Sequence, residues 1–215
     1  FASALVSRGI GPGDTVSIMA PNIPAMLEAH YGVPMTGAVL NALNVRLDAP
    51  AIAFILDHGE AKILFTDRAF SPVISEALKL AKCDPLVIDI DDAPEEGGEF
   101  LGSIEYEAFL DAGDPNHDWR WPADEWEAIS LCYTSGTTGN PKGVMVTHQM
   151  YVAAGQGFAH WTQAHPEDRF FTCLPYYHAN IQYYSTMGSL AAGATLVVAD
   201  RFSASRFWGQ VREAR

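Results

Sequence analysis

Residues 131–144 read LCYTSGTTGNPKGV, and this stretch determines how the rest of the chain is interpreted. The apolar runs 127–133 before it and 143–147 after it have the length and composition of short β-strands. Between them, hydroxyl residues and glycines run unbroken from Thr134 to Gly139, and Lys142 follows. The sequence therefore predicts two strands joined by a polar, glycine-rich loop.

Outward from this loop, short β-rich segments alternate with segments of helical periodicity. Alternation of this kind is typical of βαβ units, whose parallel sheets are buried on both faces. We therefore predict an α/β fold. Its expected strands are 15–20, 37–43, 61–66, 85–90, 127–133, 143–147, 169–174 and 194–199; its expected helices are 1–8, 21–36, one capped by Asp48, 71–81, 103–110 capped by Ser103, 148–162, 181–192 and 203–212.

The composition excludes several classes of protein. The 215 residues are 48% hydrophobic, with a net charge of −13, which is typical of a globular protein and not of a disordered acidic tail. Thirteen basic residues against 26 acidic ones argue against nucleic acid as a partner. The uncharged stretch 170–199 contains polar residues and glycines, so a strand, a helix and a strand are expected there, with no membrane-spanning segment. Three widely spaced cysteines favour a reducing compartment, and we expect a cytoplasmic protein.

The loop has the chemistry of a phosphate-binding site. Consecutive backbone N–H groups with few side chains in the way form an anion-binding concavity, to which the hydroxyls and Lys142 add donors. The spacing fits neither the Walker A pattern, because Gly143 follows Lys142, nor the dinucleotide pattern, because Thr138 stands where a glycine is required. A polar hairpin is the alternative, but a bare turn does not need four hydroxyls, two glycines and a lysine.

Other polar and aromatic residues are weaker candidates. Cys132 is expected to be a small core residue, because no acidifying neighbour is evident. The carboxylates of Asp48, Glu60 and Asp67 are interpreted as solvated charges at turns or helix ends. Three tryptophans in the acidic connector are expected to pack on the domain surface: Trp119, Trp121 and Trp126.

The motif LCYTSGTTGNPKGV, followed by Thr147-His148, closely resembles the phosphate-loop signature of the adenylate-forming enzymes, the acyl-CoA synthetase family. The resemblance extends over the whole chain through VSIMAPN (16–22), GAVLNALNVRL (37–47) and LPYYHA (174–179). It implies that residues 1–215 are part of the large N-terminal, AMP-binding domain. The family's ribose aspartate, its Thr-Glu pair for Mg²⁺ and the lysine of its small C-terminal domain find no match before Arg215. We therefore expect that this chain alone does not catalyse adenylation.

The resemblance implies a two-step ligase reaction. A carboxylic acid attacks the α-phosphate of Mg²⁺-bound ATP, and the acyl-adenylate is then opened by a thiol, usually that of coenzyme A. The residues that carry over to the phosphates are Thr134, Ser135, Gly136, Thr137, Thr138, Gly139 and Lys142, with Lys142 and Thr137 as the catalytic candidates. His178, in PYYHA, and Tyr177 are expected to line the acyl pocket or to gate thiol entry. Ordinary aromatic packing remains an equal alternative for Tyr176, Tyr177 and Tyr183.

Other functions within this resemblance stay open. The segment up to Gly143 is most similar to medium-chain and methylmercaptopropionate-type ligases, and the segment from Gln182 to carnitine/crotonobetaine-CoA ligases. The acid could therefore be a fatty acid or a carnitine-like acid. An adenylation domain that loads a carrier protein, a non-catalytic nucleotide-binding remnant and an α/β domain of another role are the alternatives. The sequence does not reveal the oligomeric state.

Overall fold

The computed structural model describes residues 1–92, 97–134 and 140–215. Its strands are β1 (Thr15–Met19), β2 (Val39–Ala42), β3 (Ala61–Asp67), β4 (Leu86–Ile90), β5 (Ile104–Glu105), β6 (Ala128–Thr134), β7 (Lys142–Thr147), β8 (Arg169–Thr172) and β9 (Thr195–Val198). Its α-helices are α1 (Ala2–Ser7), α2 (Pro24–Gly32), α3 (Ala49–His58), α4 (Ser71–Leu80), α5 (Tyr106–Asp111), α6 (His148–Thr162), α7 (Met187–Ala192) and α8 (Phe207–Glu213). Short 3-10 turns span Pro34–Thr36 and Arg68–Phe70.

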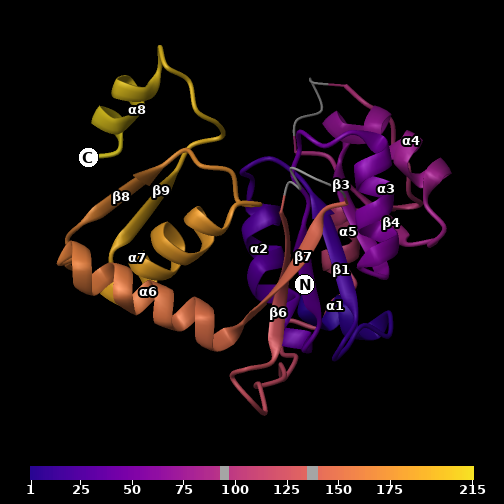
Figure 1. The fold of residues 1–215 in the computed structure, drawn as a ribbon, viewed down its shortest axis with the longest axis horizontal. Coiled ribbons are helices and arrows are strands. Elements are labelled where there is room, and N and C mark those ends of the chain that lie inside the picture. The colour runs from indigo at the N-terminus through magenta and orange to yellow at the C-terminus, as the bar shows by residue number, and fades with distance from the viewer. Residues whose placement is uncertain (93–96, 135–139) are drawn as a thin grey trace.

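Seven strands form one sheet in the order β5-β4-β3-β1-β2-β6-β7, and β8 and β9 form a separate parallel pair (Figure 1). The predicted α/β fold is thus confirmed. One edge of the sheet departs from the predicted parallel arrangement, because β7 runs antiparallel to β6. The connection between these strands, residues 135–141, is too short for the crossover that a parallel pair needs.

Helices cover both faces of the large sheet. On one face, α1, α2 and α5 pack Leu5, Met26 and Phe109 into a core with alternate strand residues such as Phe65. On the other face, α3 and α4 form a second core with residues that include Leu64. All five residues of β1 are buried, as expected for a central parallel strand covered on both sides.

Two predicted helix starts had different outcomes. Asp48 caps α3 as predicted, because its carboxylate accepts a hydrogen bond of 3.1 Å from the Ala51 amide. The predicted cap Ser103 is wrong: the chain first joins the sheet as β5, and the Glu105 carboxylate then caps α5 through the amides of Glu107 and Ala108.

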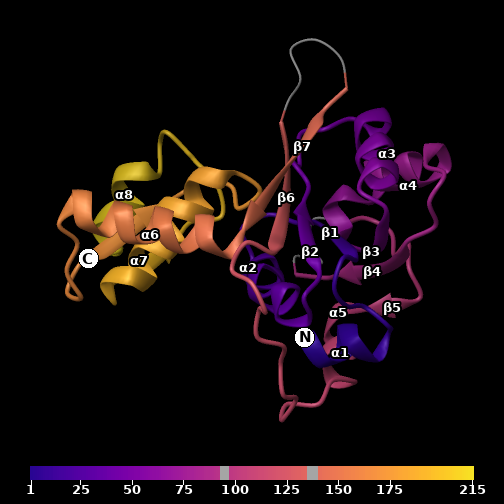
Figure 2. The same cartoon turned by 60° about the horizontal axis from the view of Figure 1, so that its bottom comes forward.

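Residues 148–215 form a unit beside the large sheet, coloured orange to yellow in Figures 1 and 2. Helix α6 has the predicted bounds, whereas the predicted helix 181–192 begins as a π-helical turn, Ile181–Thr186, before α7. The two helices touch closely, since a Cβ on Gly155 would lie 2.6 Å from the Met187 Cβ. Within the described residues, no helix is long and apolar enough to cross a bilayer.

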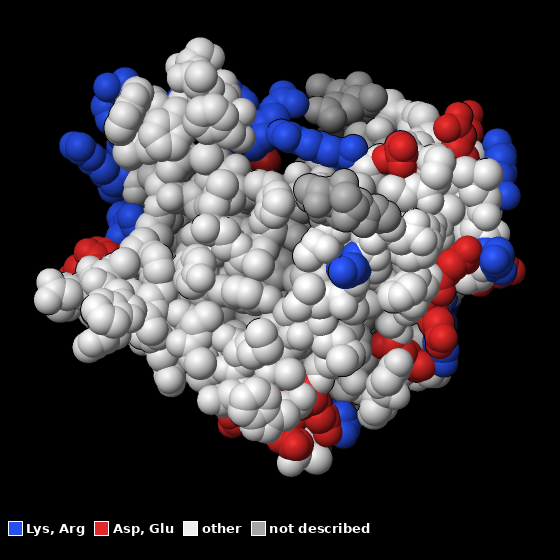
Figure 3. All heavy atoms as spheres, viewed as in Figure 1, with Lys and Arg blue, Asp and Glu red and all other residues white. Residues whose placement is uncertain are grey.

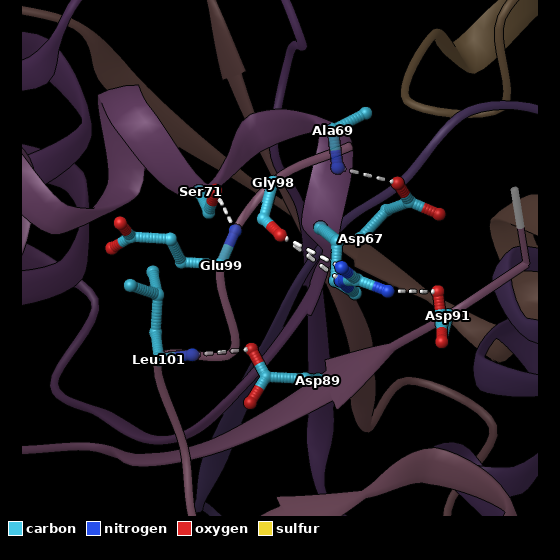
Figure 4. A network of polar contacts seen from close by, with 9 residues as sticks. Asp67, Ala69, Ser71, Asp89, Asp91, Gly98, Glu99 and Leu101 are labelled. Atoms are coloured by element: carbon cyan, nitrogen blue, oxygen red, sulfur yellow. Dashed lines mark hydrogen bonds and ion pairs between the residues drawn. The ribbon is translucent and has the colours of Figure 1, made fainter. Parts of the chain in front are cut away.

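Carboxylates at the ends of β3 and β4 bind backbone amides (Figure 4). Asp89 accepts from the amides of Leu101 and Gly102, at 3.0 and 2.7 Å, and Asp67 accepts from the Ala69 amide at 2.9 Å. The prediction that Asp67 is a solvated charge is wrong, because only 3% of its surface is exposed. Asp67 thus binds the segment that follows β3, and Asp89 binds the segment that precedes β5.

Candidate functional site

The ends of β6 and β7 hold the predicted phosphate loop. Thr134 is the last residue of β6 and Lys142 the first of β7, and the two are register partners. The Thr134 hydroxyl lies 3.4 Å from the Lys142 carbonyl oxygen, to which it donates. Five of the predicted site residues lie outside the described residues: Ser135, Gly136, Thr137, Thr138 and Gly139. The structure therefore shows the mouth of the loop, where Thr134 and Lys142 face one another across the hairpin.

The turn 173–180, which carries Tyr177 and His178, is bound by an asparagine in the loop after β1. Asn22 donates through Nδ2 to the carbonyl oxygens of Leu174 and Ala199, at 2.9 and 3.0 Å, and accepts from the Tyr176 amide at 3.0 Å. These bonds fasten the carboxyl ends of β8 and β9 to the carboxyl end of β1. Ligand sites in α/β sheets form at such strand ends.

Thr134, Tyr177 and His178 line one cleft of about 80 Å³, which we call the strand-end cleft. Its other walls come from the end of β2, from α3 and from the two strands of the hairpin: Asn41, Ala42, Leu43, Asn44, Leu47, Ile55, Tyr133 and Pro141. Residues 134, 177 and 178, predicted separately from the sequence, thus meet in space. Lys142 is exposed and is not part of this lining.

The neighbouring tyrosines lie elsewhere. Tyr176 is buried and faces a separate, mainly apolar cavity of about 210 Å³ between α2 and α6, which His30 and Tyr151 also line. The Tyr183 ring packs against Tyr151, with centroids 4.8 Å apart. Burial raises the pKa of both Tyr176 and Tyr183, so both hydroxyls keep their protons at neutral pH. Among the three tyrosines, only Tyr177 faces the strand-end cleft.

Surrounding residues differ in what they offer to the site. Burial raises the pKa of the Cys132 thiol, which suits a small core residue and not a nucleophile. Trp119 lines the apolar cavity, and Trp121, although 72% exposed, lies against Trp119 with ring centroids 4.2 Å apart. Trp126 is 67% exposed, contrary to the predicted packing on the surface. In Figure 3 the centre of the visible face carries few charged side chains, and acidic ones gather at its right and lower margins. An anionic substrate would meet little repulsion at that centre.

Two residues at the site were missed by sequence reasoning. Asn22 ends the segment VSIMAPN, which contributed to the family resemblance, but no hydrogen bonds to the turn 173–180 were predicted for it. His58, at the end of α3, lies 2.7 Å through Nδ1 from the Tyr133 hydroxyl. Its partner is 75 residues away in the sequence, so no local pattern could have indicated the contact.

The mainly parallel sheet, with a hydroxyl- and glycine-rich loop and an aromatic–histidine turn at its strand ends, defines an α/β protein of the adenylate-forming type. The sequence profile of the AMP-binding enzyme family matches residues 1–215, and the chain belongs to that family.

Curated relatives are similar in sequence to this chain. An acetate/butyrate–CoA ligase of Arabidopsis thaliana, AAE7, named as peroxisomal, is 47% identical over 193 residues, which cover 84% of this chain and 34% of that protein. An acetate–CoA ligase of Humulus lupulus, CCL3, is 48% identical over 161 residues, covering 69% of this chain and 28% of that protein. The chain thus spans about a third of the length of these relatives.

Solved structures share the fold. The anthranilate CoA ligase AuaEII, in complex with anthranoyl-AMP, has a TM-score of 0.85 at 21% identity over 99% of this chain and 40% of that chain. The inhibitor-bound N-terminal domain of FACL13 from Mycobacterium tuberculosis has a TM-score of 0.76 at 28% identity, over 99% of this chain and 50% of that chain.

Proposed function

We propose that the whole protein containing this chain is an ATP-dependent acid–thiol ligase that joins a carboxylic acid to coenzyme A. The observation that carries the proposal is the family match over the entire chain, together with relatives at 47% and 48% identity that are named CoA ligases. The meeting of Thr134, Tyr177 and His178 at one cleft supports it.

In this reaction a carboxylate oxygen attacks the α-phosphorus of ATP, and the bond to pyrophosphate breaks. The leaving pyrophosphate gathers negative charge, which fixed donors stabilise most strongly when they are in place beforehand. We assign this task to the loop from Thr134 to Gly139 and to Lys142, with Lys142 and Thr137 as catalytic residues. In the second step the thiolate of coenzyme A attacks the acyl carbon and AMP leaves.

Magnesium enters this proposal as part of the ATP complex. In the portions of the chain that the structure describes, no group of three or more His, Cys, Asp or Glu side chains gathers to hold an ion. The resemblance assigns Mg²⁺ to a Thr-Glu pair that has no match in this sequence, so no Mg²⁺ ligand is proposed in this chain. The ribose and the C-terminal lysine contact are likewise assigned to parts of the relatives' length that this chain does not cover.

His178 and Tyr177 are proposed to contact the acyl group or the path of the thiol. The acid is proposed to be short and aliphatic, because the relatives AAE7 and CCL3 are named for acetate and butyrate. A panel of acetate, butyrate, longer fatty acids, carnitine and benzoate tests this assignment. A preference for carnitine or for long chains would contradict it.

ATP–pyrophosphate exchange tests the function itself. The whole protein should exchange pyrophosphate in the presence of the acid, whereas the 215-residue chain alone should not. Lys142→Ala should lower kcat by about a hundredfold and change the KM for the acid little, because a donor aimed at developing charge acts in the chemical step. No exchange would favour a non-catalytic nucleotide-binding protein, and transfer only to a carrier domain would favour a carrier-loading role.

The compartment remains a prediction. AAE7 is named as peroxisomal, whereas the cysteine content led us to expect the cytoplasm. A fluorescent fusion of the whole protein distinguishes the two.

A further inference from the structure

We propose that His58 is a positioning residue that holds Tyr133, and through it the mouth of the phosphate loop, in register with the strand-end cleft. The inference rests on the proposed function, because it assigns a role to the residue that supports the same loop. Nothing in the loop motif itself points to His58, which lies at the end of α3.

The contact between His58 and Tyr133 is well defined. The His58 Nδ1 and the Tyr133 Oη are 2.7 Å apart, and the two rings meet edge to face with centroids at 5.8 Å and an angle of 80°. Phe54, one helical turn earlier, stacks on the imidazole at 5.4 Å and 24°. The imidazole is therefore oriented by its own helix before it meets the tyrosine.

Tyr133 is confined on its other sides by glycines. A Cβ on Gly143, its register partner in β7, would lie 3.3 Å from the Tyr133 Cζ. A Cβ on Gly59 would lie 3.4 Å from the Tyr133 hydroxyl oxygen. The ring thus lies directly against the backbone of Gly143 and close to that of Gly59, and the hydrogen bond to His58 fixes the position of its hydroxyl.

Tyr133 is connected to both ends of the phosphate loop. Thr134 is its chain neighbour, and Gly143, the register partner of Tyr133 in β7, directly follows Lys142 in the sequence. Tyr133 and Thr134 both line the strand-end cleft. A shift of the ring therefore moves both Thr134 and Lys142 relative to His178.

We expect the hydrogen bond between His58 and Tyr133 to affect the position of the loop more than the stability of the fold. His58 is exposed and Tyr133 half-buried, so water could replace either partner without leaving a buried group unsatisfied. Burial raises the pKa of the Tyr133 hydroxyl, which therefore keeps its proton. Loss of the bond should change catalysis more than folding.

The test uses ATP–pyrophosphate exchange by the whole protein in four variants. His58→Ala and Tyr133→Phe should each lower kcat by about threefold to tenfold, with a smaller change in the KM for the acid. The double variant should be no worse than either single one, because both remove the same bond. His58→Asn, which keeps a polar atom near the position of Nδ1, should restore most of the activity.

A matched control is His165→Ala, which removes an exposed histidine from the loop before β8 and should leave exchange unchanged. The 15N shift of the His58 Nδ1 should move in Tyr133→Phe, and this checks the contact independently of activity. Exchange that is unaffected by His58→Ala, or additive losses in the double variant, would overturn this inference alone. Absence of exchange in the unmodified protein would instead overturn the proposed function.

Discussion

Replacing Asn22 with alanine should loosen the junction between the two sheets. The side chain makes three hydrogen bonds, to the Leu174 carbonyl, the Ala199 carbonyl and the Tyr176 amide, and all three partners belong to the unit 148–215. Alanine removes both the donor and the acceptor and fills none of the space. The turn that carries Tyr177 and His178 would then keep the packing of Tyr176 in the core and the hydrogen bond from Gln182 to the Tyr176 carbonyl, but would lose its three bonds to the loop after β1.

The size of the effect follows from those bonds. A hydrogen bond contributes about 0.5–1.5 kcal/mol net, so the free energy of unfolding should fall by about 2–4 kcal/mol. For a domain of this size, that loss corresponds to a fall in Tm of roughly 4–16 °C. Urea unfolding followed by circular dichroism measures the first quantity, and calorimetry the second.

Amide hydrogen exchange localises the change. The Tyr176 amide donates to Asn22 and should exchange faster in the variant, whereas the Phe65 amide in the core strand β3 should change only by the global loss. Asn116→Ala, at an exposed position of the connector, is the matched control and should change stability by less than about 0.5 kcal/mol. If Asn22→Ala lowers the free energy of unfolding no more than Asn116→Ala and the Tyr176 amide stays protected, Asn22 does not hold the junction.

Two further predictions concern packing and pH. Gly155→Ala should lower the free energy of unfolding by about 1–3 kcal/mol, because its Cβ would meet Met187. A Cβ at Gly157 in the same helix meets nothing within 4 Å, so Gly157→Ala should raise the free energy of unfolding by up to about 1 kcal/mol. Urea titration measures both variants, and equal effects would contradict the close packing of α6 and α7. Burial lowers the pKa of His30 from 6.5 to about 4, so the unfolded chain binds more protons between these values and stability should decrease by up to about 3 kcal/mol as the pH falls through this window. His30→Gln should remove that part of the pH dependence, and NMR titration of the His30 ring with an apparent pKa near 6.5 would refute the assignment.

Much of the fold could be predicted because its signals are local. Helix α6 begins where Thr147 caps it, with the hydroxyl accepting from the Met150 amide, and it has the predicted bounds. The errors occurred where pairing with another segment decided the outcome. Residues 104–105 joined β4 as a strand before the helix began, which moved the cap from Ser103 to Glu105. The antiparallel direction of β7 was predictable in principle, since the short connection to β6 permits no crossover.

The candidate site shows the same division between local and distant determinants. Thr134, Lys142 and His178 could be named from residue type and motif, because a phosphate loop requires hydroxyls, glycines and a cation within one short segment. Asn22 could not, since its partners lie 152, 154 and 177 residues away, and one asparagine in a loop carries no signal of what it will bind.

The backbone groups at the ends of β8 and β9 explain why an asparagine suits position 22. The strands β8 and β9 end at Thr172 and Val198. Backbone carbonyl groups beyond these residues have no strand partner and need another donor. The Asn22 amide donates twice and accepts once without adding charge, whereas a hydroxyl has only one hydrogen to donate. A carboxylate at position 22 could accept from the Tyr176 amide but would repel the two carbonyl oxygens, so Asn22→Asp should destabilise the junction at least as much as Asn22→Ala, although it preserves the shape of the side chain.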